Sequence, residues 1–100
     1  MTLDEILLDI HRMEEDLLLF ERKYGVRTET FYAAYQRGEE PEDDTWVLDW
    51  SEWAGTYEIW LHRQEKYRQT IQTLMQQGMI KNLTQLIGKA ARHEPLTISA

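Results

Sequence analysis

The sequence predicts an all-α protein: a long antiparallel helical hairpin, with a short helix in the connection and a further helix towards the C-terminus. Two stretches, residues 3–24 and 45–77, carry apolar side chains at alternating steps of three and four. This spacing places the apolar side chains on one face of an α-helix. The segment between the two stretches contains a loop of acids and a proline, which separates the two long helices.

Residues 3–24 are predicted to form the first long helix. Thr2 and Glu5 form a T-x-x-E capping box, a pattern that satisfies the free backbone N–H groups of a helix start. Gly25 supplies the C-terminal stop. Four further leucines lie beside the main stripe, and such a wide apolar surface implies a second packing neighbour. The stripe extends over three heptads and consists of Leu3, Ile6, Ile10, Met13, Leu17, Phe20 and Tyr24.

A short helix is predicted next, with Thr28 as its N-cap and Gly38 as its end. Residues 39–45 (EEPEDDT) then contain one proline and five acids, which is typical of a loop. Acidic side chains are favourable at a helix N-terminus, so this loop is predicted to cap the next helix. The capping candidates are Asp43, Asp44 and Thr45, and the short helix has Phe31, Ala34 and Tyr35 on one face.

Residues 45–77 are predicted to form the second long helix, which contains all four tryptophans of the chain. Only Gly55 interrupts its pattern before Gly78, and a glycine inside a helix costs about 1 kcal/mol. This helix would be roughly 50 Å long, whereas the first helix would be roughly 33 Å long. We therefore expect either a second subunit to cover the remainder or a bend in the helix. Its stripe consists of Trp46, Trp50, Trp53, Tyr57, Trp60, Gln64, Tyr67, Ile71 and Leu74.

The last predicted helix covers about residues 79–92 and would fold back over part of the second long helix. Pro95 follows it and stops it, because proline cannot continue a helix. We expect residues 1–94 to form a single helical domain and residues 95–100 to form a flexible tail. The apolar stripe of this helix consists of Ile80, Leu83, Ile87 and Ala90.

The charge of the chain is distributed unevenly. Residues 1–60 contain sixteen acids and five Lys or Arg, a net charge of −11, whereas residues 61–100 contain two acids and six Lys or Arg, a net charge of +4. An acidic body argues against wrapping of nucleic acid and favours a basic partner. Only the basic C-terminal segment, with Lys81, Lys89, Arg92 and His93, offers a place for a phosphate contact.

Composition also indicates the compartment. The chain has no cysteine, which removes disulfides and thiolate chemistry and is typical of a cytoplasmic protein. Its first ten residues carry acids where a secretory signal peptide would carry bases. The longest apolar run, residues 17–20, is too short to span a bilayer. We therefore expect a cytoplasmic protein that has no contact with the membrane.

Three histidines raise the hypothesis of a metal site. His62 has Glu58 and Glu65 near it on a helix, and His11 has Glu14 at the same spacing. A carboxylate-bridged di-iron bundle needs more acids in a different order, so a solvated helix face is favoured. The sequence contains no nucleophile constellation, no glycine-rich phosphate loop and no H-E-x-x-H motif. We predict no catalytic residue, no cofactor and no metal ligand.

The aromatic stripe has three interpretations: a core, a ligand box or an interaction surface. A ligand box would need convergent polar groups, and few are present. Tryptophans are too bulky for the seam of a tight two-stranded coiled coil, but they are enriched at the centres of protein interfaces. We therefore predict a core that continues into a subunit interface in a homodimer. The predicted interaction residues are Trp46, Trp50, Trp53, Tyr57, Trp60, Phe31, Tyr35 and Tyr67.

Residues 17–61 contain a composite pattern: E-x-K-Y-G, then an F-Y pair, a G-E step and W-x-x-x-Y-E. This pattern resembles a group of small bacterial and archaeal helical proteins, frequent in cyanobacteria, whose genes often stand beside those of toxin partners. The segment from Met79 onward departs from the shorter members of the group. The matching residues are Phe20, Glu21, Lys23, Tyr24, Gly25, Phe31, Tyr32, Tyr35, Gly38, Glu39, Trp53, Tyr57 and Glu58.

The resemblance implies an antitoxin-like protein that binds and neutralises a partner toxin. In this hypothesis, the acidic body meets a basic, nucleic-acid-binding face of the toxin and masks it. Two alternatives remain at this point. One is a helical bundle that binds a metal or small ligand and acts as an enzyme, and the other is a structural adaptor that dimerises.

Overall fold

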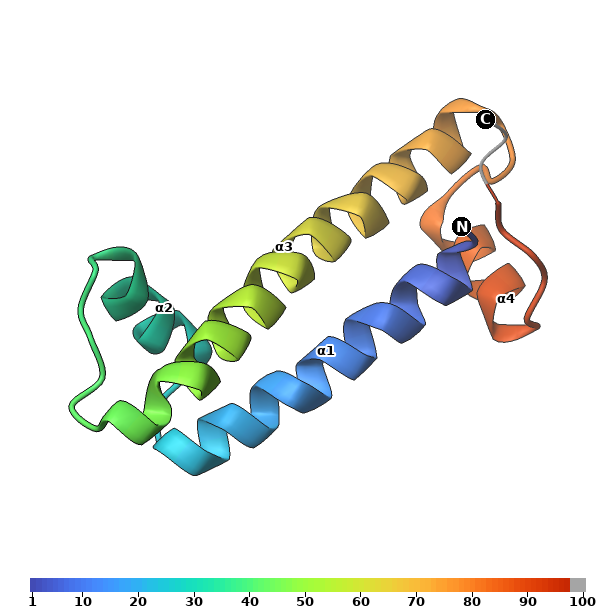
Figure 1. Ribbon diagram of the computed structural model, residues 1–100. Helices are drawn as coiled ribbons and strands as arrows, with labels where there is room; N and C mark the ends of the chain where they lie inside the picture. The colour runs from blue at the N-terminus through green and yellow to red at the C-terminus, as the bar shows by residue number, and fades with distance from the viewer. Residues whose placement is uncertain (98–100) are drawn as a thin grey trace. The chain divides into compact units, whose positions relative to one another are not determined.

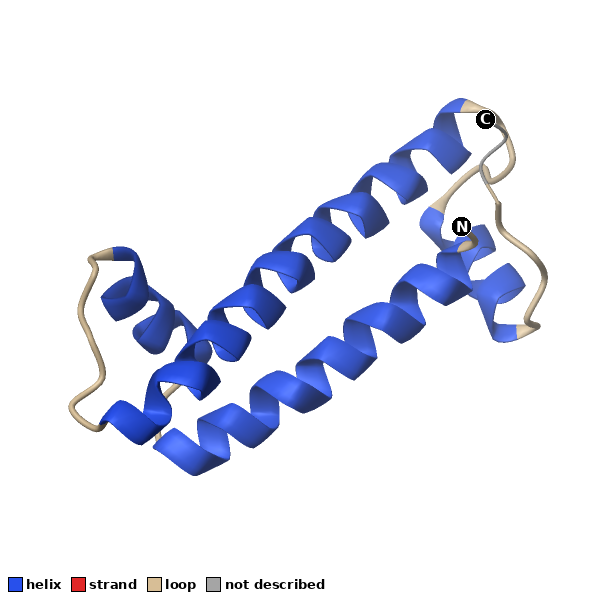
Figure 2. Ribbon diagram, viewed as in Figure 1, coloured by secondary structure: helices blue, strands red, loops and turns tan. Residues whose placement is uncertain are grey.

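The structure, a computed structural model, describes residues 1–97, and all regular elements in this range are helical. The long helices α1 (Leu3–Tyr24) and α3 (Val47–Gln76) pair with each other, which confirms the predicted all-α helical hairpin (Figures 1 and 2). The connection contains α2 (Thr28–Gln36) and a short 3-10 helix, η1 (Asp44–Trp46). The last helix is α4 (Leu83–Ala91).

The chain folds into two compact units, and the long helices α1 and α3 each contribute to both. The acidic unit comprises His11–Leu61, and the terminal unit comprises Met1–Ile10 together with the chain from His62 onward. The acidic unit contains thirteen acids and five Lys or Arg, a net charge of −8, whereas the terminal unit has a net charge of +1. Within the predicted helical domain of residues 1–94, each unit has a buried core.

The core of the acidic unit surrounds Trp53, which is only 1% exposed. Phe31 of α2 stacks face to face with Trp53, with 3.9 Å between the ring centroids. Phe20 and Tyr24 of α1 also stack against Trp53, at 5.6 and 5.5 Å. Leu17 joins them in the same buried cluster. The part of the aromatic stripe around Trp53 therefore forms the core that holds α1, α2 and α3 together.

The start of α2 is held by a side chain from the end of α1. Thr28 donates to Glu21 Oε2 from its backbone N–H at 2.7 Å and from its hydroxyl at 2.8 Å. Arg27, not Thr28, is the N-cap of α2, and it forms no capping hydrogen bond with its side chain. The predicted capping role of Thr28 is therefore wrong. The distant Glu21 supplies the acceptor that an N-cap side chain would normally provide.

The core of the terminal unit is aliphatic. Leu3 N donates to Leu96 O at 3.0 Å, and Thr2 forms an isolated antiparallel bridge with Thr97. Leu96 is buried, so the first part of the predicted flexible tail packs against the start of α1. Residues 98–100 lie outside the described residues. The buried cluster consists of Leu3, Leu74, Ile80, Leu86 and Leu96, with Tyr67 and Ile71 packed against it.

The last helix is shorter and faces differently from the prediction. It begins after Asn82, whose side chain accepts from Gln85 N at 2.8 Å and so caps α4. Ile80 is buried outside the helix, whereas Leu83 and Ile87 are 55% and 66% exposed. Leu86 is the side chain of α4 that enters the core. The predicted stripe is wrong because α4 packs on the core of the terminal unit through Leu86, while Leu83 and Ile87 remain exposed.

The long helix α3 runs without interruption for 30 residues, through Gly55. Four of its side chains are buried: Trp53, Ala54, Thr70 and Leu74. Each of the two units covers its own part of this set, so the burial of these residues requires neither a second subunit nor a break in the helix.

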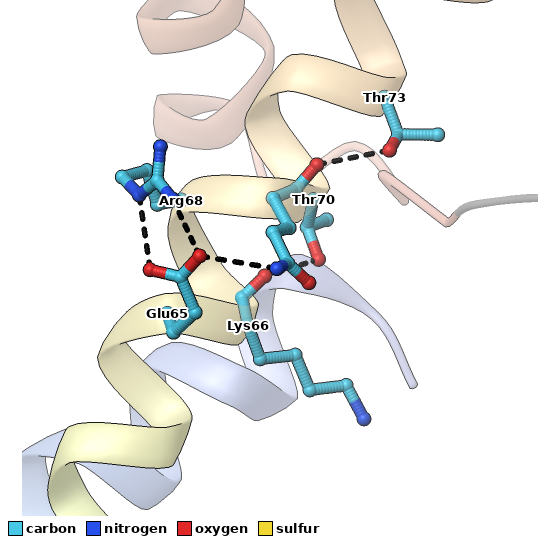
Figure 3. A network of polar contacts seen from close by, with 6 residues as sticks. Glu65, Lys66, Arg68, Thr70 and Thr73 are labelled. Atoms are coloured by element: carbon cyan, nitrogen blue, oxygen red, sulfur yellow. Dashed lines mark hydrogen bonds and ion pairs between the residues drawn. The ribbon is translucent and has the colours of Figure 1, made fainter.

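Polar contacts within α3 follow its second half (Figure 3). Glu65 pairs with Arg68 one turn later and also accepts from Gln69 Nε2 at 3.0 Å. Thr70 Oγ1 and Thr73 Oγ1 donate to backbone carbonyls one turn earlier. Glu65 and Arg68 are both exposed, so their ion pair lies on a solvated face of the helix. Exposed ion pairs of this kind contribute little to stability.

Candidate functional site

The structure brings seven of the eight predicted interaction residues into the acidic unit. Trp53 and Phe31 are buried there, at 1% and 4% exposure, and so belong to the core in this conformation. Tyr67 lies in the terminal unit, where it packs against the aliphatic cluster. Of the remaining residues, Tyr35 is exposed, and four are half-buried: Trp46, Trp50, Tyr57 and Trp60.

A pocket of about 520 Å³ opens in the acidic unit between α1, α2 and the start of α3. Its walls include two pairs of rings at right angles. Tyr24 meets Trp46 at 85° with 5.6 Å between centroids, and Phe31 meets Trp50 at 84° with 5.2 Å. Trp53 also lines the pocket, beside Phe31. We call this site the aromatic pocket.

Three carboxylates line the aromatic pocket on its loop side. They are Glu39, Glu40 and Glu42, all exposed side chains of the segment between α2 and η1. Glu39 lies 4.0 Å from Arg37, which is also exposed. Over residues 1–97, Glu40 and Glu42 form no ion pair. The pocket therefore combines aromatic walls with a rim of negative charge that is hardly compensated within the chain.

The same loop also contributes the helix cap that the sequence predicts. Asp43 accepts from Thr45 N at 2.8 Å and from Thr45 Oγ1 at 2.7 Å, and these hydrogen bonds lower the pKa of its carboxyl group. Of the three capping candidates, Asp43 caps η1 with its side chain. The sequence interpretation treats the acids of the whole loop as one solvated cap. It thus missed the rim, although the closeness of Glu39–Glu42 to Trp46 in the sequence was an available signal.

The side chain of Lys23 lies at the edge of the pocket, and its positive charge is balanced by Asp49. Lys23 Nζ lies 2.6 Å from Asp49 Oδ2 and 5.6 Å from the centroid of the Tyr24 ring. The hydroxyl of Tyr24 donates to the same Asp49 oxygen at 2.6 Å. These two donors, Lys23 first, lower the pKa of Asp49. Burial, and then the hydrogen bond to Asp49, raise the pKa of Tyr24 to about 12.

The other aromatic residues form a second group on α2 and α3. Tyr32 donates to Glu58 Oε1 at 3.1 Å, and its ring meets Tyr57 at 64° with 4.9 Å between centroids. Trp60 stacks on Tyr57 and donates from Nε1 to Glu14 Oε2 at 3.3 Å. These contacts join α2 and α1 to α3, so this group has a clear structural role.

A separate pocket in the terminal unit contains the eighth predicted residue, Tyr67. Its volume is about 320 Å³, and its walls are mostly aliphatic side chains, including Leu7, Leu86 and Ile87. The polar side chains around it belong to different elements and include Asp4 and His93. This pocket lacks the combination of aromatic faces and clustered charge that distinguishes the aromatic pocket.

The acidic and histidine side chains and the helices of residues 1–97 bear on the metal and membrane hypotheses. Within residues 1–97, no group of three or more His, Asp or Glu side chains is arranged to hold a metal ion. His11 and His62, the histidines of the metal hypothesis, are both exposed. None of the helices in the same range is both long enough and apolar enough to cross a membrane.

Comparisons with protein-family models, with curated proteins and with solved structures found no match to this chain. The pattern that resembles the antitoxin-like group nevertheless has a structural meaning here. Glu21 holds the start of α2, Lys23 and Tyr24 bind Asp49, and Gly25 makes the turn after α1 with φ +73°. Phe31 and Trp53 stack in the core, and Tyr32 binds Glu58. These residues build the acidic unit and one wall of its pocket.

Proposed function

We propose that this chain is a protein-interaction module, an antitoxin-like protein that binds a basic partner protein and neutralises it. The observation that carries the proposal is the aromatic pocket with its rim of Glu39, Glu40 and Glu42. Half-buried tryptophans are frequent anchors of protein interfaces. Here Trp46 and Trp50 line the pocket together with three carboxylates, and over residues 1–97 only Glu39 has a paired cation. The site therefore combines apolar contact area with attraction for a basic surface.

The proposed mechanism is steric and electrostatic. The acidic unit has a net charge of −8, which speeds encounter with a positively charged protein and orients it. A toxin that binds nucleic acid needs a basic face for the phosphates. By occupying that face, the acidic unit would exclude the toxin's substrate, so the chain acts by binding and not by catalysis. In this proposal it works in the cytoplasm, the compartment that its lack of cysteine favours.

We also propose that the chain forms a homodimer. Several large apolar side chains of α1 and α3 remain exposed in the acidic unit, among them Leu19, Leu48 and Ile59. A groove between these two helices is lined by Leu19, Phe20, Gly55 and Ile59. Charged side chains, among them Asp16 and Asp49, also line it. Exposed apolar surface of this kind is typical of association sites, and a second copy is the occupant proposed here.

The function is tested by co-expression with the product of the neighbouring gene. We expect that protein to be toxic alone, to lose its toxicity when the present chain is co-expressed, and to co-purify with it. The complex should weaken as salt concentration rises, because charge attraction between exposed groups is screened. No complex and no relief of toxicity would remove the antitoxin proposal. A complex without relief would support the structural-adaptor alternative.

A further inference from the structure

We propose that the aromatic pocket receives an arginine side chain of the partner protein. This inference rests on the proposed function, because it names the chemical group by which the basic partner is recognised. Three properties of the pocket carry it: the aromatic residues of its walls, the charge of its rim and the ion pair that already engages Lys23.

The walls of the pocket offer aromatic surface to a cation. In the pairs Tyr24–Trp46 and Phe31–Trp50, the two rings pack edge to face against each other at the pocket. A cation within about 6 Å of a ring centroid is attracted by the negative face of the ring. Tryptophan gives the strongest attraction of this kind, and two tryptophans, Trp46 and Trp50, line the pocket while remaining only half-buried.

The rim supplies the opposite charge. Glu39, Glu40 and Glu42 line the same pocket, and the only cation paired with any of them over residues 1–97 is Arg37, which lies 4.0 Å from Glu39. A cation bound between the rings would therefore have carboxylates within reach at the mouth of the pocket. Charge complementarity thus selects a cationic side chain over a neutral one.

Lys23 does not fill this role, because its ammonium group is engaged elsewhere. It lies 2.6 Å from Asp49 and forms the cation–π contact with Tyr24 at 5.6 Å. The contact shows that one ring of the pocket already accepts a cation on its surface. Asp49 balances the charge of Lys23, so the negative charge of the rim remains available to a partner.

Arginine fits these features better than lysine. Its guanidinium is planar, stacks on aromatic faces, is weakly hydrated and donates two parallel hydrogen bonds to a carboxylate. The lysine ammonium is compact and strongly hydrated, so it loses more on entering an aromatic site. A pocket of about 520 Å³ also has room for the apolar stem of the side chain.

The inference is tested on the isolated full-length chain with N-acetyl-arginine methylamide as the probe. Titration is followed by the NMR signals of the four indole N–H groups. We expect saturable shifts for Trp46 and Trp50 and no comparable shift for Trp60, which lies outside the pocket and binds Glu14. The citrulline derivative, which is neutral but similar in shape, should cause no saturable shift, and the lysine derivative should bind more weakly.

Two matched variants separate the rim from the general charge of the unit. The triple change Glu39→Gln, Glu40→Gln and Glu42→Gln should weaken arginine binding at least roughly threefold, which corresponds to a fraction of a kcal/mol for each exposed carboxylate. The control triple removes the same charge from exposed positions of the acidic unit outside the pocket and should leave binding nearly unchanged. It consists of Glu15→Gln, Glu29→Gln and Glu52→Gln.

The possible outcomes separate this inference from the proposed function. Equal binding of citrulline or lysine, or equal losses in the two triple variants, would overturn the arginine inference. If arginine does not bind but the co-expressed partner does, the proposed function stands and the partner uses another contact. If arginine binds specifically but no partner complex forms, the pocket assignment stands and the antitoxin function falls.

Discussion

The indole of Trp53 donates from Nε1 to Thr28 Oγ1 at 3.1 Å, and that hydroxyl donates in turn to Glu21. This buried chain of hydrogen bonds joins α3, α2 and α1 through one residue of each helix. A buried polar group is costly when it lacks a partner, so each of the three side chains depends on the others. Trp53 thus contributes both its stacking area and the donor that satisfies Thr28.

The first prediction concerns the burial of Trp53. Replacement by alanine should lower the free energy of unfolding by about 3–5 kcal/mol, because it removes a fully buried aromatic ring. Trp46→Ala should cost clearly less, since that side chain is half-buried at the pocket. Urea denaturation of both variants measures the difference. Equal losses would mean that Trp53 is not the centre of the core.

The second prediction concerns the ionisation of Tyr24. Its pKa is raised to about 12, whereas an ordinary tyrosine ionises near pH 10. A pKa that is raised in the folded state contributes stability below the unfolded value, and this contribution is lost as pH rises through the folded value. An alkaline absorbance titration should therefore contain a late step near pH 12, which Tyr24→Phe removes. If the variant keeps that step, another residue is responsible.

At the scale of elements, the starts of α1 and α4 follow local capping, whereas the start of α2 and the face that α4 buries depend on tertiary contacts. Both ends of α1 agree with the prediction. The capping box forms at its start, with Glu5 N donating to Thr2 Oγ1 at 3.1 Å, and the helix ends at Tyr24. The short α4 differs, because Asn82 begins it later than the apolar pattern suggests. A short helix can bury several alternative faces, so the tertiary neighbours decide among them.

The third prediction uses two glycines in different local structures. Gly55 lies within α3, and apart from its chain neighbours and the nearby backbone of that helix, no heavy atom lies within 4 Å of the position that a Cβ would occupy. Gly55→Ala should therefore raise the free energy of unfolding by about 1 kcal/mol. Gly25→Ala should instead lower it, because φ is +73° there and alanine is strained in that region. Thermal unfolding of both variants tests the sign of each effect.

The fourth prediction concerns the segment after α4. Leu96→Ala should lower the free energy of unfolding of the terminal unit by about 2–5 kcal/mol, because Leu96 is buried against Leu3 and Leu86. Amide hydrogen exchange should speed up in the terminal unit more than in the acidic unit. The exposed Thr97→Ala change is the control and should have a small effect. Equal exchange rates in Leu96→Ala and the wild type would show that the segment contributes little.

At the scale of the whole molecule, charge and side-chain type separate between the two units. The acidic unit has an aromatic core and a net charge of −8, whereas the terminal unit has an aliphatic core and a net charge of +1. A strongly negative surface favours encounters with basic proteins and opposes non-specific contact with nucleic acid. The proposed partner site therefore belongs to the unit that carries most of the charge.

The fifth prediction concerns the oligomeric state. Light scattering should give twice the chain mass of 12.0 kDa, as the proposed homodimer requires. The double variant Leu19→Glu and Ile59→Glu should be a monomer, because it places charges in the groove beside Gly55. Leu83→Glu changes an exposed leucine of the terminal unit and should leave the dimer intact. A wild-type monomer would contradict the dimer proposal without affecting the aromatic pocket.

The sequence by itself determined the all-α class, the two long helices and the aromatic seam, because helical periodicity and capping are properties of neighbouring residues. It also indicated the tryptophans of the candidate site, since their clustering is visible without a fold, but it did not indicate the acidic rim. Only the tertiary structure decided that Trp53 and Phe31 are core, that Glu21 holds α2, and that Glu39–Glu42 line a pocket with Trp46 and Trp50. These facts depend on contacts between residues distant in the chain, and the local pattern does not specify those contacts.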